Sequence, residues 1–410
     1  MPREMKDSGI EWIGNIPLDW KIIKIGNVYS ERRIKVSDLE YMPLSVTMKG
    51  IMSQLSTAAK SDDHDNRKLV KIGDFAINSR SDRRGSCGIS PYEGSVSLIN
   101  TVLCPKSNMN SHYYNWLFHS TMFSDEFYKW GHGIVNDLWT TNWNDMKKIF
   151  IPYPSIDEQQ KIANFLDEKV GEIDRVIAKT KESIEEYKKY RQSIISTSVT
   201  KGIDSNVTLK DSKVDWIGEI PKHWSIDKIK YSAKIRNEKY NDTLGALDYF
   251  GLENIESWSN KYFKTDSIYD LNGSQICKKD DLVFGKLRPY LSKVYKVNYD
   301  RCCSSEFAVI YDFKGSIDYL MYLMSSLSFI DYINMSTYGT KMPRANIEFI
   351  KNSFIPLPSL EEQLRIVEFI QNKVKSIDEL LNLKNSYIVQ LEQYKKSLIY
   401  EYVTGKKEVR

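Results

Sequence analysis

The sequence predicts an α+β protein in which two similar globular domains are joined by two long helices that pair as an antiparallel coiled coil. Three observations support this fold. Two segments of the sequence recur after 204 residues, and the helical one of them recurs without a gap. Each copy of the two segments ends in a helical pattern, with apolar residues every three or four positions. Between the copies lie short runs with turn signals, which are typical of strands and short helices.

Each half begins with a Trp-Ile-Gly segment. Residues 7–17 recur as residues 211–221, and Trp20 corresponds to Trp224. The segments that follow, near 21–150 and 225–354, have drifted far apart. A chain that keeps two frames fixed and varies two inserts is suited to presenting two different surfaces.

Three pairs of short segments indicate that the two inserts share one α+β fold. The members of each pair have the same pattern of turn, strand or amphipathic helix. The pairs are Lys71–Ile77 with Lys278–Phe284 (turn, then strand), Thr101–Leu103 with Ala308–Ile310 (strand), and His112–Phe118 with Asp318–Met324 (helix).

Basic and aromatic residues gather in loops at equivalent places in the two inserts. One pair of loops is 79–86 and 285–290, and the other is 139–143 and 339–344. Arg can read guanine edges through two hydrogen bonds, Lys and Arg hold phosphates, and aromatic rings stack on bases. Each residue alone is equally well explained as a solvated loop side chain, but the set favours contact with nucleic acid. The candidate DNA-binding residues are Arg80, Arg83, Arg84, Trp139, Lys286, Arg288, Tyr290, Lys341 and Arg344.

The helical pattern starts at the same signal in both halves. An Ile-Pro-x-Pro run keeps the chain extended, because a residue before proline avoids the helical region. Ser155 and Ser359 then stand at the N-cap position, and Glu158 and Glu362 follow three residues later. This spacing predicts a capping box at the start of both helices.

A heptad seam of about four heptads follows in each helix, which is typical of a coiled coil. Polar residues interrupt it at matching places, Thr180 with Lys384 and Arg191 with Lys395, and such breaks fix register at a cost in stability. The alternative is two amphipathic helices that pack on separate domains. The remaining seam positions are Leu166, Val170, Ile173, Ile177, Ile184, Tyr187 and Ile194 in the first helix, and Ile370, Val374, Ile377, Leu381, Ile388, Leu391 and Leu398 in the second.

The connectivity favours an antiparallel pair, because about 150 residues separate the end of the first helix from the start of the second. A rod of about 40 residues at about 1.5 Å per residue is about 60 Å long. The two halves are then related by a pseudo-two-fold axis, as in a homodimer fused into one chain. The expected organisation is a globular domain over 1–150, a helical spacer over 151–204, a second domain over 205–354 and a second spacer over 355–410.

Composition and charge fit a soluble recognition protein. The chain is 41% hydrophobic and 27% charged, and no apolar run approaches the length of a membrane span. Its five cysteines show no paired pattern, which fits a reducing cytoplasm without structural zinc. The helical segments 155–200 and 359–404 each carry a net charge of −1, so that the rest of the +4 chain carries +6. This excess is compatible with anion binding by the inserts.

The sequence lacks the motifs of catalysis on DNA. We find no Gly-x-x-x-x-Gly-Lys-Ser/Thr phosphate loop, no Asp/Asn-Pro-Pro-aromatic motif and no metal-ligand spacing among the histidines. The sequence therefore favours a binding protein. A self-contained DNA modification or cleavage enzyme and a protein-only coiled-coil scaffold stay open as alternatives.

The doubled helix start resembles that of the DNA specificity subunit of type I restriction–modification enzymes. Residues 151–162 and 355–366 carry the resemblance, together with 249–255, 281–290 and 305–309. The resemblance implies that each globular domain is a target recognition domain that reads one half of a split, asymmetric site in double-stranded DNA. It implies that the helices set the spacing between the halves and dock two adenine-N6 methyltransferase subunits.

The same resemblance implies that the chain binds no cofactor and has no catalytic residue of its own. S-adenosylmethionine, ATP and Mg²⁺ are expected in the partner subunits, which include a restriction subunit with translocase and nuclease activity. No membrane partner is expected.

Overall fold

The computed structural model describes residues 3–54, 64–133, 139–240, 247–265, 271, 273–339 and 341–409. It divides into two compact units. Unit 1 comprises Met1–Thr180 and Asn385–Arg410, and unit 2 comprises Lys181–Lys384. Two long helices, α5 (Ile156–Lys201) and α10 (Leu360–Val403), each contribute residues to both units. Their limits match the helices that the periodicity predicted.

Unit 1 places short helices on small antiparallel sheets. Its helices besides the long ones are α1 (Ile25–Val28), α2 (Ser111–His119), α3 (Thr121–Lys129) and α4 (Trp143–Met146). Its strands are β1 (Met5–Asp7), β2 (Asn15–Pro17), β3 (Lys21–Lys24), β4 (Tyr29–Glu31), β5 (Lys35–Val36), β6 (Leu44–Thr47), β7 (Gly50–Ser53), β8 (Arg67–Val70), β9 (Phe75–Asn78), β10 (Cys87–Ile89), β11 (Gly94–Ser97), β12 (Asn100–Pro105) and β13 (Phe150–Tyr153).

Unit 2 repeats this plan with shorter or altered edge strands. Its short helices are α6 (Ile229–Ser232), α7 (Ile317–Ser325), α8 (Leu327–Met335) and α9 (Ile347–Asn352). Its strands are β14 (Leu209–Asp211), β15 (Glu219–Pro221), β16 (Ser225–Lys228), β17 (Lys234–Arg236), β18 (Tyr249–Phe250), β19 (Gln275–Cys277), β20 (Leu282–Gly285), β21 (Val294–Lys296), β22 (Arg301–Cys303), β23 (Phe307–Tyr311) and β24 (Phe354–Leu357).

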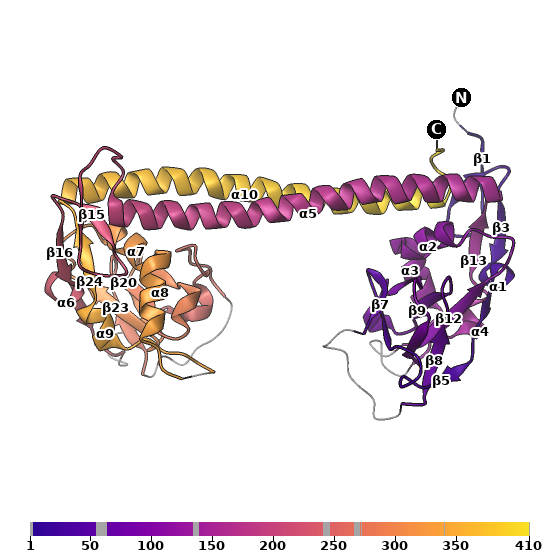
Figure 1. Ribbon diagram of the computed structural model, residues 1–410, viewed down its shortest axis with the longest axis horizontal. Coiled ribbons are helices and arrows are strands. Elements are labelled where there is room, and N and C mark those ends of the chain that lie inside the picture. Colours follow the sequence, from indigo (N-terminus) through magenta and orange to yellow (C-terminus); the bar gives the residue numbers. More distant parts are fainter. Residues whose placement is uncertain are drawn as a thin grey trace. The chain divides into compact units, whose positions relative to one another are not determined.

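The central sheet has the same antiparallel order in both units. Strands pair as β10-β9-β12-β4 in unit 1 and as β21-β20-β23-β17 in unit 2. The register is also the same, because Leu103 faces Phe75 and Ile310 faces Leu282. In each unit, the helix that follows this sheet, α2 or α7, lies between the sheet and the long helices (Figure 1). The three pairs of matching segments that the sequence predicted are therefore confirmed.

The Ile-Pro-x-Pro run forms a strand beside the start of each long helix. Strand β13 pairs with β3, and β24 pairs with β16, in equivalent registers. Trp20 and Trp224, which lie just before β3 and β16, are almost completely buried. This arrangement anchors the first turn of α5 and of α10 to the globular part of its own unit.

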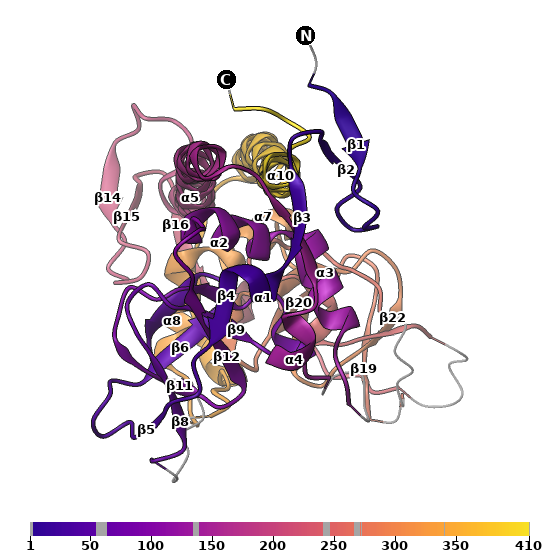
Figure 2. The same cartoon turned by 90° about the vertical axis from the view of Figure 1, so that its right-hand side faces the viewer.

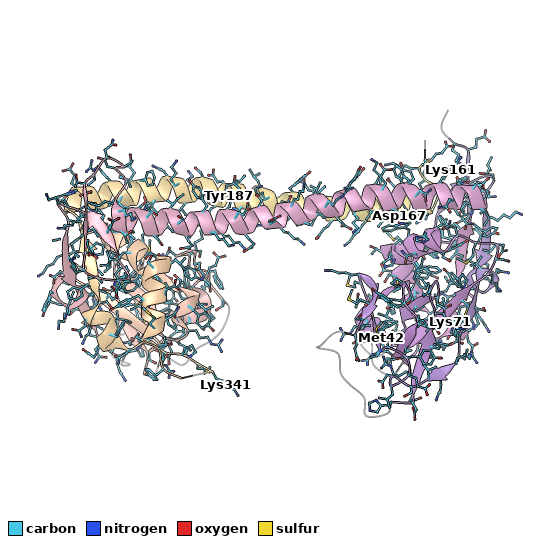
Figure 3. The ribbon with its side chains drawn as sticks, viewed as in Figure 1. Met42, Lys71, Lys161, Asp167, Tyr187 and Lys341 are labelled. Atoms are coloured by element: carbon cyan, nitrogen blue, oxygen red, sulfur yellow. The ribbon has the colours of Figure 1, made fainter. Side chains whose placement is uncertain are left out.

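Within each unit, α5 and α10 lie side by side and run antiparallel (Figures 1 and 2). In unit 1 the ring of Phe165, early in α5, lies 4.4 Å from that of Tyr402, late in α10. In unit 2 the ammonium of Lys384 lies 5.5 Å from the ring of Tyr187, which Figure 3 labels on α5. Every predicted seam position is buried or half-buried. The antiparallel coiled coil is therefore confirmed, and the separate packing of the two helices is excluded.

The end of α10 is held by the hairpin of β1 and β2 in unit 1. The Tyr400 hydroxyl donates to the carbonyl of Trp12 at 3.2 Å, and the Lys406 ammonium donates to the carbonyl of Ile13 at 2.6 Å. Figure 2 shows the hairpin beside this end of α10. The Trp-Ile-Gly segment of unit 1 thus holds the end of α10 through its backbone carbonyls.

Candidate nucleic-acid interface

In unit 1 the two predicted loops lie against each other at the end of the central sheet. Arg80 and Thr140 form an antiparallel bridge, and the Ser81 amide donates to the Trp139 carbonyl at 2.9 Å. The amide of Thr141 donates to the carbonyl of Ser79 at 3.0 Å. Two loops that are about 60 residues apart in sequence therefore form one surface.

Unit 2 joins its two loops in the same way. Leu287 pairs with Arg344, and the Arg288 amide donates to the Pro343 carbonyl at 2.7 Å. A further bridge in the second loop, Tyr338 with Arg344, matches that of His132 with Thr140 in unit 1. The sequence grouped these loops by their composition and equivalent positions, and the structure brings the two loops of each unit together.

The unit 1 cations of this surface have acidic neighbours. Arg84 is 59% exposed, donates to Asp125 at 2.8 Å and covers the Tyr128 ring at 5.4 Å. Arg80 and Arg83 lie 3.2 and 3.7 Å from the carboxylate of Asp82. Arg83 is the most exposed of the three arginines, at 68% of its side chain. Trp139 is half-buried and, with Arg84, lines a cavity of about 660 Å³.

In unit 2 the exposed candidates are Arg288, Tyr290, Lys341 and Arg344. Lys341 lies at the edge of unit 2 opposite the long helices (Figure 3). Arg288 has a left-handed backbone with φ of 51°, an uncommon conformation for a non-glycine residue. Thr340, which precedes Lys341, lies outside the described residues.

Two of the unit 2 candidates, Arg344 and Lys286, are less available to a ligand. Arg344 makes a two-pronged contact with Glu306 at 2.5 and 2.8 Å, and this carboxylate raises the pKa of Arg344. Lys286 is half-buried, and burial lowers its pKa. Of the unit 2 candidates, Arg288 and Lys341 therefore carry exposed charges that no carboxylate in the described part of the chain neutralises.

A repeated ion pair, absent from the sequence prediction, braces the turn before the central strand of each unit. Arg32 donates to Asp74 at 2.6 and 3.0 Å, and Arg236 donates to Asp281 at 2.7 and 3.0 Å. Each aspartate also accepts a backbone amide from the residue three positions earlier, at 2.8 Å. These pairs fix the strands β9 and β20, which lead into the candidate loops.

The predicted helix caps are half confirmed. The Ser155 hydroxyl accepts the Glu158 amide at 3.3 Å, and the Ser359 hydroxyl accepts the Glu362 amide at 3.3 Å. The reciprocal half of the predicted capping box is wrong within the described residues, because both carboxylates bind elsewhere. Glu158 accepts from Trp20 Nε1 at 2.8 Å and from Arg3, and Glu362 contacts His223 at 2.9 Å.

A buried glutamine beside each cap was also missed. Gln159 Oε1 accepts the amide of Asn110 at 2.8 Å, while its Nε2 donates to Pro154 at 2.9 Å. Gln363 repeats both bonds with Ser316 and Pro358 at the same distances. Asn110 and Ser316 are the N-caps of α2 and α7. Each glutamine thus links the start of a long helix to the start of the helix beneath it.

The described residues lack the features of a metal centre and of a membrane-spanning helix. They contain no group of three or more His, Cys, Asp or Glu side chains placed to hold a metal ion. No described helix is sufficiently long and apolar to cross a membrane.

Comparison with known proteins identifies relatives along nearly the whole chain. The family model described as type I restriction modification DNA specificity domain matches residues 17–186 and again 210–393. The MjaVIII type I restriction enzyme specificity subunit of Methanocaldococcus jannaschii is 26% identical, over 96% of this chain and 94% of that protein. The EcoDI specificity subunit of Escherichia coli is 22% identical, over 96% of this chain and 89% of that protein.

Solved structures show the same fold. A chain from work on complex assembly and conformational transition of the type I R-M system has a TM-score of 0.71 and 12% identity, over 96% of this chain and 99% of that chain. The HsdS subunit from Thermoanaerobacter tengcongensis has a TM-score of 0.54 and 15% identity, over 96% and 98%. With both halves matched by one family model and both units sharing one fold, the chain belongs to the type I restriction–modification DNA specificity family.

Proposed function

We propose that this chain is the non-catalytic subunit that selects the DNA site for a type I restriction–modification complex. One observation carries the proposal beyond family membership. Both units build the same surface from two loops joined by the same backbone bridges, yet the side chains on those bridges differ. A constant frame with variable side chains is what reading of different base sequences requires, because base edges specify sequence and backbone contacts only position the protein.

The difference between the two surfaces supports an asymmetric, bipartite site. On the surface of unit 1, Arg83 is exposed beside Asp82 and Trp139 is half-buried. On the surface of unit 2, Arg288 and Tyr290 are exposed. Arginine most often reads guanine, and an exposed aromatic ring can contact a base or the sugar. Each unit would therefore read its own half-site.

The long helices are proposed as the spacer and the dock for partner subunits. A helix of about 46 residues spans about 70 Å at about 1.5 Å per residue, which is about two turns of duplex DNA. Each unit contains the start of one long helix and the end of the other, and so each offers an equivalent helical surface. We propose that each surface docks one adenine-N6 methyltransferase subunit, which makes two per complex.

Catalysis is assigned to the partner subunits. The methyltransferase subunits would bind S-adenosylmethionine, and the restriction subunit would use ATP and Mg²⁺. This assignment rests on the relatives, which are named specificity subunits of type I restriction enzymes. We place the site of action in the cytoplasm, with the host DNA.

The direct test is a map of adenine methylation in a host with and without this gene. The proposal expects a split motif that disappears when the gene is removed and returns when it is supplied again. A methylation pattern that is independent of the gene would overturn the proposal.

Two further assays separate the other function classes. The purified chain, incubated alone with DNA, Mg²⁺ and S-adenosylmethionine, is expected to transfer no methyl group, and transfer would indicate a self-contained enzyme. The chain assembled with its methyltransferase subunits is expected to retard a duplex that carries the motif. Equal retardation of a scrambled duplex would instead favour a scaffold without sequence recognition.

A further inference from the structure

We propose that a basic groove in unit 2, two of whose lysines have no counterpart in unit 1, holds the phosphodiester backbone beside the bases that unit 2 reads. This inference rests on the proposed function. It makes the second half-site the one with the additional, sequence-independent grip on DNA.

The groove has a volume of about 640 Å³ and lies over the β17–β23 side of the central sheet, between α6 and α9. Its floor includes Ala308, a small residue in β23. Five cationic side chains and one carboxylate, that of Glu348, line it. The cations are Lys230, Lys234, Arg236, Lys286 and Lys351.

Three of these cations already have an anionic partner. Arg236 is bound by Asp281, Lys234 lies 2.7 Å from Asp312, and Lys351 lies 2.7 Å from Glu348. Lys230 and Lys286 have no carboxylate within ion-pair distance among residues 3–409 as far as these are described. Two ammonium groups that line one groove without an ion-pair partner of their own favour an anion there.

Burial strengthens this preference at Lys286. Its ammonium is half-buried, and desolvation lowers its pKa, while Glu306 opposes that change and Arg344 adds to it. An anion in the groove would stabilise the charged form of Lys286. Gln275 adds a polar group, since its side chain is nine-tenths buried and its Oε1 has no hydrogen-bond partner. Rotation of this amide would present its NH₂ group, a donor for a phosphate oxygen.

Unit 1 shows that the fold does not require Lys230 and Lys286. By strand register, Ser79 stands where unit 2 has Lys286, and Thr101 stands where unit 2 has Ala308. The two unit 1 hydroxyls bind each other at 2.9 Å and are both buried. Gly26 occupies the place of Lys230. Lys230 and Lys286 are therefore additions to the shared frame, whereas Arg236 recurs in unit 1 as Arg32 and Lys351 as Lys147.

The position of the groove identifies the anion as a phosphate of DNA. The Lys286 side chain lines the groove, while the next residues, Leu287 and Arg288, form the bridged loop that is proposed to read bases. A strand whose bases meet Arg288 would place its neighbouring phosphates at the groove. Lys286 is thereby assigned to positioning the DNA and not to base reading.

The test is the salt dependence of binding of the chain, assembled with its methyltransferase subunits, to a duplex that carries the methylated motif. Each phosphate contact contributes about 0.9 to the slope of log K against log salt concentration. The double variant Lys230→Ala/Lys286→Met should therefore lower the slope by about 2. Lys286→Arg should retain the slope. Lys213→Ala, an 84% exposed lysine in the turn between β14 and β15, should leave it unchanged.

Amine labelling of the wild-type complex provides the same test without a substitution. Lys230 and Lys286 should lose reactivity when DNA binds, and Lys213 should not. The proposed phosphate site would be overturned by an unchanged salt slope or by groove lysines that DNA does not protect. Protection by ATP but not by DNA would also overturn it. A wild-type complex without any preference for the motif would instead overturn the proposed function, so the two failures are distinguishable.

Discussion

Lys395 donates to both carboxylate oxygens of Asp174 at 2.7 Å and so joins α10 to α5 in unit 1. The residues 204 positions away form the reciprocal pair in unit 2, where Arg191 of α5 lies 3.4 Å from Asp378 of α10. A parallel, in-register pairing of the helices would place Asp174 beside Asp378 and Arg191 beside Lys395. Like charges at both levels would oppose that arrangement. The polar breaks in the seam thus select the antiparallel orientation.

The two pairs should contribute unequally to stability. The Lys395 and Asp174 side chains are 28% and 53% exposed, and ion pairs that solvent reaches contribute about 0.2–1 kcal/mol. Arg191 is 7% exposed and also donates to the Trp258 carbonyl at 2.7 Å, and an orphaned buried group costs about 1–3 kcal/mol. Arg191→Leu should therefore reduce amide hydrogen-exchange protection around Asp378 more than Lys395→Leu reduces it around Asp174. Equal losses would contradict the different roles of the two pairs.

The buried glutamines at the helix starts give a second stability test. Gln363→Leu removes the acceptor of the Ser316 amide and the donor to Pro358, and should lower the free energy of unfolding by about 1–3 kcal/mol. Gln159→Leu should behave alike. The exposed Gln371→Leu on α10 is the matched control and should change stability by less than about 0.5 kcal/mol. If urea denaturation gave a similar loss of unfolding free energy in all three variants, the proposed role of the buried glutamines in linking the helix starts would be contradicted.

His119 should make unit 1 sensitive to mild acid. Burial lowers the pKa of His119, and its Nδ1 lies 2.7 Å from the Asn115 carbonyl. The unfolded chain therefore binds a proton more readily, so stability is fully present above the unfolded pKa of about 6.5 and is lost as pH falls from there through the lower pKa of the folded state. Thermal melting at pH 7.5 and 5.5 should show a smaller drop for His119→Gln than for the wild type. The exposed His112→Gln should keep the wild-type drop, and a His119→Gln drop as large as the wild type's would refute the effect.

The spacer role predicts a change in site geometry. One heptad inserted at matched positions of both long helices preserves the seam and adds about 10 Å, or about three base pairs. The methylated motif should then have a longer gap between unchanged half-sites. Methylome sequencing that finds the original gap would show that the helices do not set the spacing.

Local signals explain why the helices could be predicted and the details of the interface could not. The caps at Ser155 and Ser359 act on the next helical turn, and the apolar repeat is visible within each heptad. Because both signals are local in sequence, the limits of α5 and α10 could be predicted. The partners of Arg32 and Gln159 lie 42 and 49 residues away, and neither pairing leaves a local pattern. The recurrence of Arg32 as Arg236 and of Gln159 as Gln363 was the available signal.

The candidate loops show the same limit. Their composition and equivalent positions predicted the two surfaces, but composition could not distinguish Arg344, which is bound to Glu306, from the exposed Arg288. It also could not place Lys286 in a groove apart from the reading loop. Ion pairing and burial depend on residues distant in sequence, and these decide which cations are available to DNA.

Reading of one half-site by unit 2 is tested most directly by methylome sequencing of a host that carries Arg288→Ala. Loss of one bidentate base contact costs about 1–3 kcal/mol of discrimination. We predict that a single position in one half of the motif becomes relaxed, while the other half and the gap stay unchanged. Lys213→Ala, in the same unit, should give the wild-type motif. An Arg288→Ala motif identical to the wild type, or relaxed in both halves, would contradict the assignment.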